Sequence, residues 1–301
     1  MSAIDDKLGE ISKPKQRSRN TFWRRFLRSP TGLFGAILFG MLIFISVLSP
    51  VIVPYSPLEQ VSPPLLAPST QHFLGTDELG RDILSRVIAG SRLSIAIAVG
   101  AAILSAIIGT PLGVVAGYFG GVVDGFVMRI TDFALALPGI LAALVVIVVL
   151  GSNAVNVAIA IAIGSSPAFA RLSRAKTLEV KTRAFVQASK TMGASHLDIM
   201  MRTIAPNVIP PLVVQTVVTA SMAVLATAAL SFLGLGAPPP APTWGAMLHD
   251  ANSYLWDSPI YGIAPGLALT ITVVAFDALG KGVSAAIGGA SDHERGVGGH
   301  V

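Results

Sequence analysis

Apolar residues gather in long uninterrupted runs along the chain instead of recurring at the spacing of an amphipathic helix or strand. A helix needs roughly 20 apolar residues to cross a bilayer core about 30 Å thick. Six runs approach or reach that length, and they are residues 33–53, 93–117, 133–151, 154–170, 208–235 and 263–280. The fourth run is short and is interrupted by Gly164 and Pro167. The pattern predicts an all-α, polytopic integral membrane protein with six transmembrane helices.

The composition favours a membrane protein over a soluble one. The 301 residues are 52% hydrophobic and 12% charged, whereas soluble domains carry about 25% charged residues. Lys and Arg number 21 against 16 Asp and Glu, which gives a formal net charge of +5. Aromatic and basic residues do not interleave as a nucleic-acid surface requires, so we interpret the excess as orientation charge. The chain has no cysteine, which excludes disulfides, thiolate metal sites and thiol catalysis.

A basic segment precedes the first apolar run, as it would in a cleavable signal peptide. The run is longer than the roughly 7–15 residues of a signal-peptide core. Three prolines, Pro50, Pro54 and Pro57, stand where small residues suited to cleavage would be expected. We therefore interpret the run as an uncleaved first helix.

Basic residues mark one side of the membrane. Residues 1–31 hold eight Lys or Arg, residues 171–207 hold seven, and the loop at 236–262 holds none. Four predicted helices separate the two basic segments, so both segments lie on the same side. We expect both termini and residues 171–207 in the cytoplasm, and the protein in the plasma or inner membrane of a bacterium or archaeon.

The chain is thus expected to have three parts. Residues 1–31 form a basic cytoplasmic segment, residues 32–281 the transmembrane domain, and residues 282–301, with six glycines, a flexible cytoplasmic tail. Residues 21–30 are either a loose linker or a short interfacial helix that places aromatic and aliphatic side chains at headgroup level. Those side chains are Phe22, Trp23, Phe26 and Leu27.

The external segment at 72–92, HFLGTDELGRDILSRVIAGSR, predicts a short amphipathic helix outside the membrane. Thr76 or Asp77 can cap this helix, and apolar residues recur at helical spacing from Leu79 to Ile88. The helix either docks a partner and supports a gate, or merely leads the chain back into the membrane. The candidate residues are Gly75, Thr76, Asp77, Gly80, Arg81 and Asp82.

A second informative segment, AFVQASKTMGASHLDIMMRTIAP at 184–206, lies in the cytoplasmic loop. It predicts a helix over 185–192, a turn at Gly193 and a second helix over 195–201. Pro206 is expected to separate the loop from the fifth membrane helix, because the residue before a proline is biased away from helix. The first helix either docks in a groove of a soluble partner or lies on the membrane surface as a connector.

In this segment Ala188, Gly193 and Pro206 fall in the order of a known motif. The segment resembles the "EAA loop" of ABC-importer permeases, whose consensus is E-A-A-x(3)-G-x(9)-I-x-L-P. Further motifs of the dipeptide/oligopeptide/nickel subfamily occur in order along the chain. They are FLGTDELGRD (73–82), AGYFGG (116–121), ARLSRA (170–175), PNVIPPLVVQ (206–215), ALSFLGLG (229–236) and PTWGAML (242–248).

This resemblance covers about residues 21–285. It implies a type I permease that carries the longer N-terminal extension of the subfamily. It also implies a second homologous permease as heterodimer partner, two cytoplasmic ABC ATPase subunits and an external solute-binding protein. The implied ATPase-coupling residues, with exposed apolar side chains at 185, 186 and 192, are Phe185, Val186, Gln187, Ala188, Ser189, Met192, Gly193, Ala194 and Ser195.

The chain departs from the family pattern in two places. Gln187 stands where the family has Glu, with Ser189, Thr203 and Ala205 at three further consensus positions. An amide keeps a hydrogen bond but not the charge-assisted bond of a carboxylate, which is roughly twice as strong. After the last helix, residues 280–284 read GKGVS in place of the family's G-D-x-L-R-D type of ending.

No phosphate-binding loop of the form G-x-x-x-x-G-K-[ST] is present. The chain is therefore not the ATP-hydrolysing subunit, we predict no catalytic residue in it, and we expect ATP and Mg²⁺ to be bound by the partner ATPases. No cofactor or metal is expected in this chain, because the five histidines lack the spacing of metal ligands. They are His72, His196, His249, His293 and His300.

Charged residues within apolar runs are costly and often functional. Arg129 and Asp132 are three residues apart and are expected to pair at a helix end, with either a structural or a gating role. Asp277 is expected to pair with Lys281. The polar side chains of Gln215, Thr216, Thr219 and Ser221 either line the translocation pathway or pack helices together.

Two other classes of protein compete with the permease. An intramembrane aspartyl protease would need Asp132 and Asp277 to face each other near the midplane, yet both lie near helix ends. A secondary transporter would need repeat symmetry and a midplane site, and neither is evident in the sequence. The sequence therefore favours a permease subunit of an ATP-driven importer. Its expected substrates are short peptides, with nickel chelates or haem as alternatives.

Overall fold

The computed structural model of the chain describes residues 19–288, and within them the secondary structure is helical apart from one isolated bridge between Thr76 and Asp82. The helices are α2 (Arg19–Arg28), α3 (Pro30–Ile52), α4 (Ile83–Phe119), α5 (Gly121–Ala136), α6 (Gly139–Leu150), α7 (Ala154–Lys181), α8 (Ala184–Thr191), α9 (His196–Asp198), the π-helix η1 (Ile199–Ile204), α10 (Ala205–Phe232), α11 (Trp244–Ala251), the 3₁₀-helix η2 (Asn252–Tyr254) and α12 (Pro259–Gly288). This confirms the predicted all-α class.

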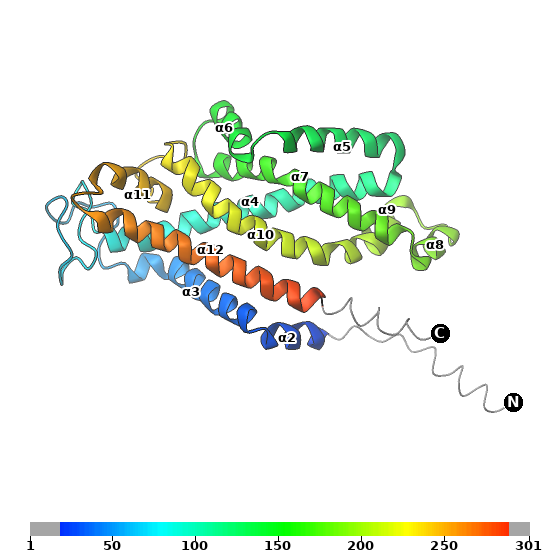
Figure 1. Cartoon of the computed structure of the whole chain (residues 1–301), viewed down its shortest axis with the longest axis horizontal. Coiled ribbons are helices and arrows are strands. Elements are labelled where there is room, and N and C mark those ends of the chain that lie inside the picture. The colour runs from blue at the N-terminus through cyan, green and yellow to red at the C-terminus, as the bar shows by residue number, and fades with distance from the viewer. Residues whose placement is uncertain (1–18, 289–301) are drawn as a thin grey trace.

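Five helices of the described chain are long and apolar enough to cross a membrane, and they are α3, α4, α7, the continuous helix at His196–Phe232, and α12. The pair α5 and α6 passes the same test only together, with a bend of 95° between them. The predicted set of six spans is thus matched if the bent pair counts as one. In Figure 1 the long helices α4, α7, α10 and α12 run lengthwise through a bundle, with α3 along one side and α5 along the other.

The predicted limits of the third and fourth spans are wrong. The third helix begins at Gly121 rather than at 133, and it breaks at Leu137 and Pro138, where Leu137 is extended. The proline ring biases the preceding residue away from the helical region, and at Leu137 this bias prevails, so the apolar run at 133–151 is divided between two helices. The fourth run continues well past residue 170, to Lys181.

A stripe of three glycines on α4 brings it against α7. A Cβ on Gly109 would lie 2.2 Å from the Ser166 carbonyl oxygen, and one on Gly113 would lie 2.1 Å from the Ala170 carbonyl oxygen. Gly117 repeats the contact one turn further on, with 2.9 Å to the Arg174 oxygen. Small residues four apart allow such close approach in membrane proteins, and they make α4 and α7 one tightly packed pair.

The N-terminal helices pack on α12. A Cβ at Gly35 of α3 would lie 2.3 Å from the Leu279 backbone nitrogen, so the two backbones nearly touch. Residues 21–28 are helical, which is not the structure of a loose linker, and Phe26 is buried while Trp23 is exposed. The place of this helix at headgroup level stays a prediction. The tail predicted from residue 282 is wrong at its start, because α12 continues to Gly288. Residues 1–18 and 289–301 lie outside the described residues.

The bundle has two distinct ends. One carries the long loop at 53–82 together with α11, and we call it the α11 end; the other carries α8 and α9, and we call it the α8 end (Figure 1). The candidate residues are distributed over both ends and along α10.

Candidate functional site

The helix predicted within the 72–92 segment, with Thr76 or Asp77 as its cap, is wrong in its first part. Residues 76–82 form a compact turn, and helix begins only at Ile83, with Asp82 rather than Thr76 or Asp77 as the N-cap. Gly75 and Gly80 take the left-handed φ values of +80° and +77°. A Cβ at these glycines would approach the Leu66 and Ser62 carbonyl oxygens to 2.2 and 1.9 Å. The two glycines therefore let the turn fold against residues 62–66.

Asp77 is the centre of this turn, and its side chain is fully buried. It accepts hydrogen bonds from the backbone N–H groups of Leu79 and Arg81, each at 2.9 Å, and from the Arg81 Nε at 2.6 Å. Arg86 of α4 approaches the same carboxylate with its Nη1, at 2.9 Å from Oδ2. A buried carboxylate requires this degree of pairing, because an unpaired buried charge is strongly unfavourable.

The other predicted turn residues also act through hydrogen bonds. The Thr76 hydroxyl donates to the Pro63 carbonyl at 2.8 Å and accepts from the Leu66 N–H at 2.9 Å. Asp82 accepts from the Ser85 N–H at 2.8 Å and is hydrogen-bonded to the His72 Nδ1 at 2.9 Å. The turn is thus a built structural unit joined to the start of α4.

Two acidic residues connect this unit to the later part of the chain. Glu78 accepts from the Arg81 Nη2 at 2.9 Å and from the Tyr261 hydroxyl of α12. Asp250 of α11 lies 3.7 Å from the Arg86 Nη2, and its pKa is raised by burial and by the negative charge of Glu78. These residues border a hollow of about 240 Å³ at the α11 end.

At the α8 end, the predicted helix–turn–helix over 185–201 is confirmed in outline. α8 spans Ala184–Thr191, and the turn at Gly193 has φ +79°. A Cβ at Gly193 would meet nothing within 4 Å, so the glycine serves the left-handed backbone and not close packing. The Ser195 hydroxyl caps α9 by accepting from the Asp198 N–H at 3.2 Å.

The apolar side chains of this segment are divided between two faces. Phe185 and Met192 are exposed as predicted, at 46% and 79%, whereas Val186 is completely buried, which corrects its predicted exposure. Two residues that the sequence reasoning passed over, Leu197 and Met201, are exposed at 67% and 64%. Their spacing of four residues is the signal that could have found them. The exposed apolar face of the segment therefore consists of Phe185, Met192, Leu197 and Met201.

The polar residues of α8 hold the segment in place. Gln187 donates from Nε2 to the Lys181 carbonyl at the end of α7, at 3.0 Å. A glutamate could not donate this bond, so the departure from the consensus has a structural use here. The Ser189 hydroxyl donates to the Phe185 carbonyl, and the Ala194 N–H closes the turn on the Ser189 carbonyl at 3.1 Å. Ala188 contributes its carbonyl, which accepts from the Met192 N–H at 3.0 Å.

Pro206 does not separate the loop from the membrane helix, contrary to prediction. α9, η1 and α10 follow one another without a break, and Ala205 keeps helical angles of −54° and −43° before the proline. The Ala205 N–H bonds to the Met200 carbonyl, five residues back. The π-helix accommodates a proline that has no N–H of its own to donate.

The polar residues on α10 bond mainly within the helix or to its neighbour. Thr216 donates to the Leu212 carbonyl at 2.8 Å, and Gln215 lies 3.4 Å from the Thr219 hydroxyl. Ser221 is buried and donates to the Val273 carbonyl of α12 at 3.4 Å. For Thr219 and Ser221, burial supports helix packing over pathway lining.

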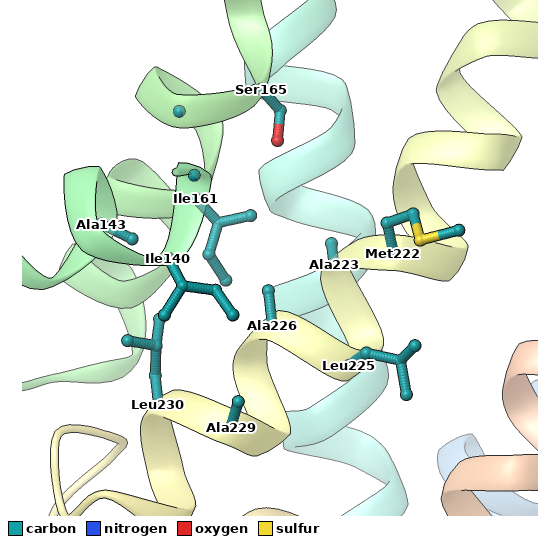
Figure 2. Close-up of a pocket in the computed structure, with 12 residues that line it drawn as sticks. Ile140, Ala143, Ile161, Ser165, Met222, Ala223, Leu225, Ala226, Ala229 and Leu230 are labelled. Carbon is teal, nitrogen blue, oxygen red and sulfur yellow. The ribbon is translucent and has the colours of Figure 1, made fainter. Parts of the chain in front are cut away.

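An apolar hollow of about 420 Å³ lies beside α10, between α6 and α7 (Figure 2). Ile140, Ile161 and Leu230 point into it, and the Ser165 hydroxyl supplies a polar group at its edge. Sequence reasoning did not find this site, because its residues come from three helices and look like ordinary membrane-helix residues. The lining is Gly139, Ile140, Ala143, Ile161, Gly164, Ser165, Met222, Ala223, Leu225, Ala226, Ala229 and Leu230.

Ion pairs join α5 to α7. Asp132 accepts from the Arg171 Nη2 at 2.6 Å, which corrects the predicted pair between Asp132 and Arg129. The Arg174 guanidinium donates two hydrogen bonds of 2.5 Å to the Asp124 carboxylate, one from Nε and one from Nη2. On α12 the predicted pair is confirmed, with Lys281 Nζ 2.7 Å from the Asp277 carboxylate. Since Asp132 and Asp277 each have a basic partner and 59% and 58% exposed side chains, neither forms a buried protease dyad.

Comparison with known proteins identifies the family. Residues 109–288, more than half of the chain, match the family model "Binding-protein-dependent transport system inner membrane component". The chain belongs to this family. Residues 20–72 of the permease match a second model, "N-terminal TM domain of oligopeptide transport permease C". The predicted membership of the dipeptide/oligopeptide ABC-importer permeases, with the longer N-terminal extension, is thereby confirmed.

Relatives and solved structures agree with this assignment. The permease is 41% identical over 268 residues to the glutathione transport system permease protein GsiD of Pectobacterium atrosepticum, covering 88% of this chain and 89% of that protein. It is 43% identical to the GsiD protein of Escherichia coli O6:K15:H31, covering 88% of each. The fold is shared with inward-facing structures of the MetNI methionine ABC transporter, with TM-score 0.57 at 19% identity, covering 68% of this chain and 97% of that one.

Proposed function

We propose that this ABC-importer permease pairs with a second, homologous permease, and that two ABC ATPases dock on the coupling loops of the pair. In this chain the coupling loop is the segment at residues 184–206, which we call the α8 segment. The family membership supports an importer of the binding-protein-dependent type. The α8 segment supports the docking role, because it presents an exposed apolar face at the end of the bundle and is held there by hydrogen bonds. That single observation carries the proposal, since an exposed amphipathic helix is a common form of groove ligand.

In the proposed orientation, the α8 end and both termini face the cytoplasm. The α11 end then faces outward and receives solute from a binding protein. Residues 171–207, around α8, carry seven Lys or Arg, whereas the 236–262 loop at the opposite end carries none. This is the distribution expected for cytoplasmic and external loops.

The proposed substrates are short peptides or peptide-like solutes. The relatives at 41% and 43% identity support them, because those proteins are named as glutathione permeases and glutathione is a short peptide. The hollow between α6, α7 and α10 is apolar apart from Ser165, which suits an organic solute better than a bare metal ion. Nickel chelates and haem are the alternative solutes to test.

The proposed mechanism is alternating access driven by the ATPases. ATP and Mg²⁺ bind to those partner subunits, and closure of the ATPases moves the docked α8 segments. The permease helices follow as near-rigid bodies, because packed helices switch between discrete arrangements more easily than they deform.

Reconstitution of the complete complex in proteoliposomes tests the function. Uptake of radiolabelled glutathione or of a dipeptide should require the binding protein, ATP and both ATPases. A nickel chelate serves as the competing substrate. Uptake by the permease alone, driven by an ion gradient, would establish the secondary transporter instead.

A further inference from the structure

A hydrogen bond links α4 to α9 across 78 residues of sequence. The Tyr118 hydroxyl, in the last turn of α4, lies 2.8 Å from the Nδ1 of His196 at the start of α9. The two rings meet edge to face, with centroids 5.7 Å apart. Lys190 of α8 places its Nζ 5.6 Å from the centre of the Tyr118 ring, within the range of a cation–π contact. We call Tyr118, His196 and Lys190 the Tyr118 link.

The environment keeps Tyr118 at a fixed position. Its side chain is 7% exposed and belongs to the same apolar cluster as Val186 and Ile199. The backbone at this helix end is held as well, because the Lys181 Nζ donates to the Gly117 carbonyl oxygen at 2.8 Å and to the Tyr118 carbonyl oxygen at 3.2 Å. The hydroxyl is therefore presented to His196 from a rigid helix end.

His196, in contrast, lies on an exposed stretch. Residues 191–198 are exposed throughout, and α9 is only three residues long. The chain connects this stretch to α7 on one side and to α10 on the other, but not to α4. A side chain of α4 thus supplies a connection that the backbone does not.

α4 can transmit a displacement because it is packed tightly on α7. The glycines at 109, 113 and 117 bring the two backbones into contact over three turns. Whatever moves the end of α4 therefore moves the α4–α7 pair. Apart from the link, motion of the α8 segment enters the bundle through the two ends of its own chain and through the apolar cluster that contains Val186 and Ile199. The Tyr118 link adds a directional polar contact to the end of α4.

We propose that Tyr118 is a positioning residue for coupling, which delivers motion of the α8 segment directly to the end of α4, in addition to the routes through α7 and α10. The inference rests on the proposed function of that segment as the ATPase contact. It gives the AGYFGG motif at 116–121 a role: the tyrosine makes the bond, and Gly120 and Gly121, with φ of +71° and +53°, turn the chain away so that the helix end stays open to His196.

The test uses the complete transporter in proteoliposomes and measures solute taken up per ATP hydrolysed. Tyr118→Phe removes only the hydroxyl and keeps the ring for packing and for Lys190. His196→Ala removes the partner at an exposed position, where loss of folding is not expected. Each change should lower uptake per ATP about threefold to tenfold, the range that corresponds to one hydrogen bond. Assembly of the complex should be unchanged.

Two further variants separate positioning from general damage. The double variant Tyr118→Phe with His196→Ala should be no worse than either single change, because both remove the same bond. His196→Asn should retain much of the coupling that His196→Ala loses, since a side-chain amide can accept or donate a hydrogen bond in place of Nδ1. Tyr55→Phe is the matched control at the α11 end, where the Tyr55 hydroxyl donates to the Gln71 carbonyl at 3.1 Å.

Additive losses in the double variant, or unchanged uptake per ATP in both single variants, would overturn the inference. A wild-type complex that shows no ATP-dependent uptake at all would instead overturn the proposed function, before any variant is compared. The two failures are therefore distinguishable.

Discussion

Arg86 of α4 and Asp77 of the 76–82 turn form an ion pair in which both side chains are almost completely buried, at 4% and 0% exposure. The distance is 2.9 Å between Nη1 and Oδ2. Asp77 also accepts from Arg81, so one carboxylate holds two guanidinium groups. The pair fixes the turn to the first residues of α4, and through Glu78 and Tyr261 the turn is fixed to α12.

Asp77→Ala should unfold this end of the bundle. Breaking a buried pair by removing one partner costs about 3–5 kcal/mol, and the buried Arg86 would keep only Asp250, at 3.7 Å, as a partner. We expect a clearly lower midpoint of thermal unfolding in detergent, measured on purified protein. Glu59→Ala, at an exposed position of the same loop, is the control and should leave the midpoint unchanged. Equal midpoints for the two variants would show that the turn is not a structural unit.

Gly113→Ala should separate α4 from α7. The new Cβ would lie 2.1 Å from the Ala170 carbonyl oxygen and 2.0 Å from the Ser173 hydroxyl, so the helices must move apart. We expect poor recovery of monodisperse protein after detergent extraction, measured by size-exclusion chromatography. Gly100→Ala, also in α4 but with open space around its Cβ position, should be tolerated. If both variants behave like the parent, the close approach of the two helices is not required.

The pH dependence of stability should contain a contribution from Asp250. Its pKa is raised above the ordinary 3.8 by burial, then by Glu78 and Asp77, and these effects outweigh the opposing ones of Arg81 and His249. The folded state therefore holds the proton more tightly than the unfolded state. The contribution of Asp250 to stability is fully present below the ordinary pKa and is lost as pH rises through the raised pKa.

Asp250→Asn removes that contribution, because an amide does not titrate. We expect the difference in unfolding midpoint, parent minus variant, to decrease as pH rises from about pH 3 to about pH 8, measured in detergent. Arg86 keeps Asp77 as its ion-pair partner in the variant, so the fold should persist. A parent-minus-variant difference that grows as pH rises would contradict the direction of the shift.

Gly193→Val should disturb coupling and leave folding intact. The glycine has φ +79° and open surroundings, so the cost is backbone strain on the order of 1–3 kcal/mol without a clash. We expect normal insertion and assembly, with reduced ATP hydrolysis and uptake by the complete complex. Gly193→Asn, which tolerates the left-handed region better, should retain more activity. Loss of membrane insertion would assign the glycine a folding role.

Single cysteines report the orientation directly, because the chain contains none. In intact cells, Asn252→Cys at the α11 end should react with an impermeant thiol reagent. Thr191→Cys in α8 should react only after the cells are permeabilised. Both positions are exposed, so the comparison depends on the side of the membrane and not on burial. The reverse labelling pattern would invert the proposed orientation.

Much of the architecture could be predicted from the order of apolar residues. A bilayer offers no hydrogen-bond partner to the backbone, so a long apolar run must become a helix whatever its neighbours are. The α8 segment could be located between two predicted spans from local signals. Gly193 marks the turn, and Ser195 marks the start of the second helix. Two of the family motifs, FLGTDELGRD and AGYFGG, lie at a hydrogen-bonded turn and at a hydrogen-bonded helix end.

Tertiary structure alone decided which residues face each other. Asp132 lies three residues from Arg129 in sequence, yet it pairs with Arg171, because α5 lies alongside α7. Val186 was expected to be exposed with Phe185, but the end of the bundle offers it an apolar cluster. The bond between Tyr118 and His196 has no sequence signal, since it joins two helix ends. Local sequence patterns reflect the conformational preference of the backbone and the hydrophobicity of the side chains. Side-chain partners depend instead on which helices the fold brings together.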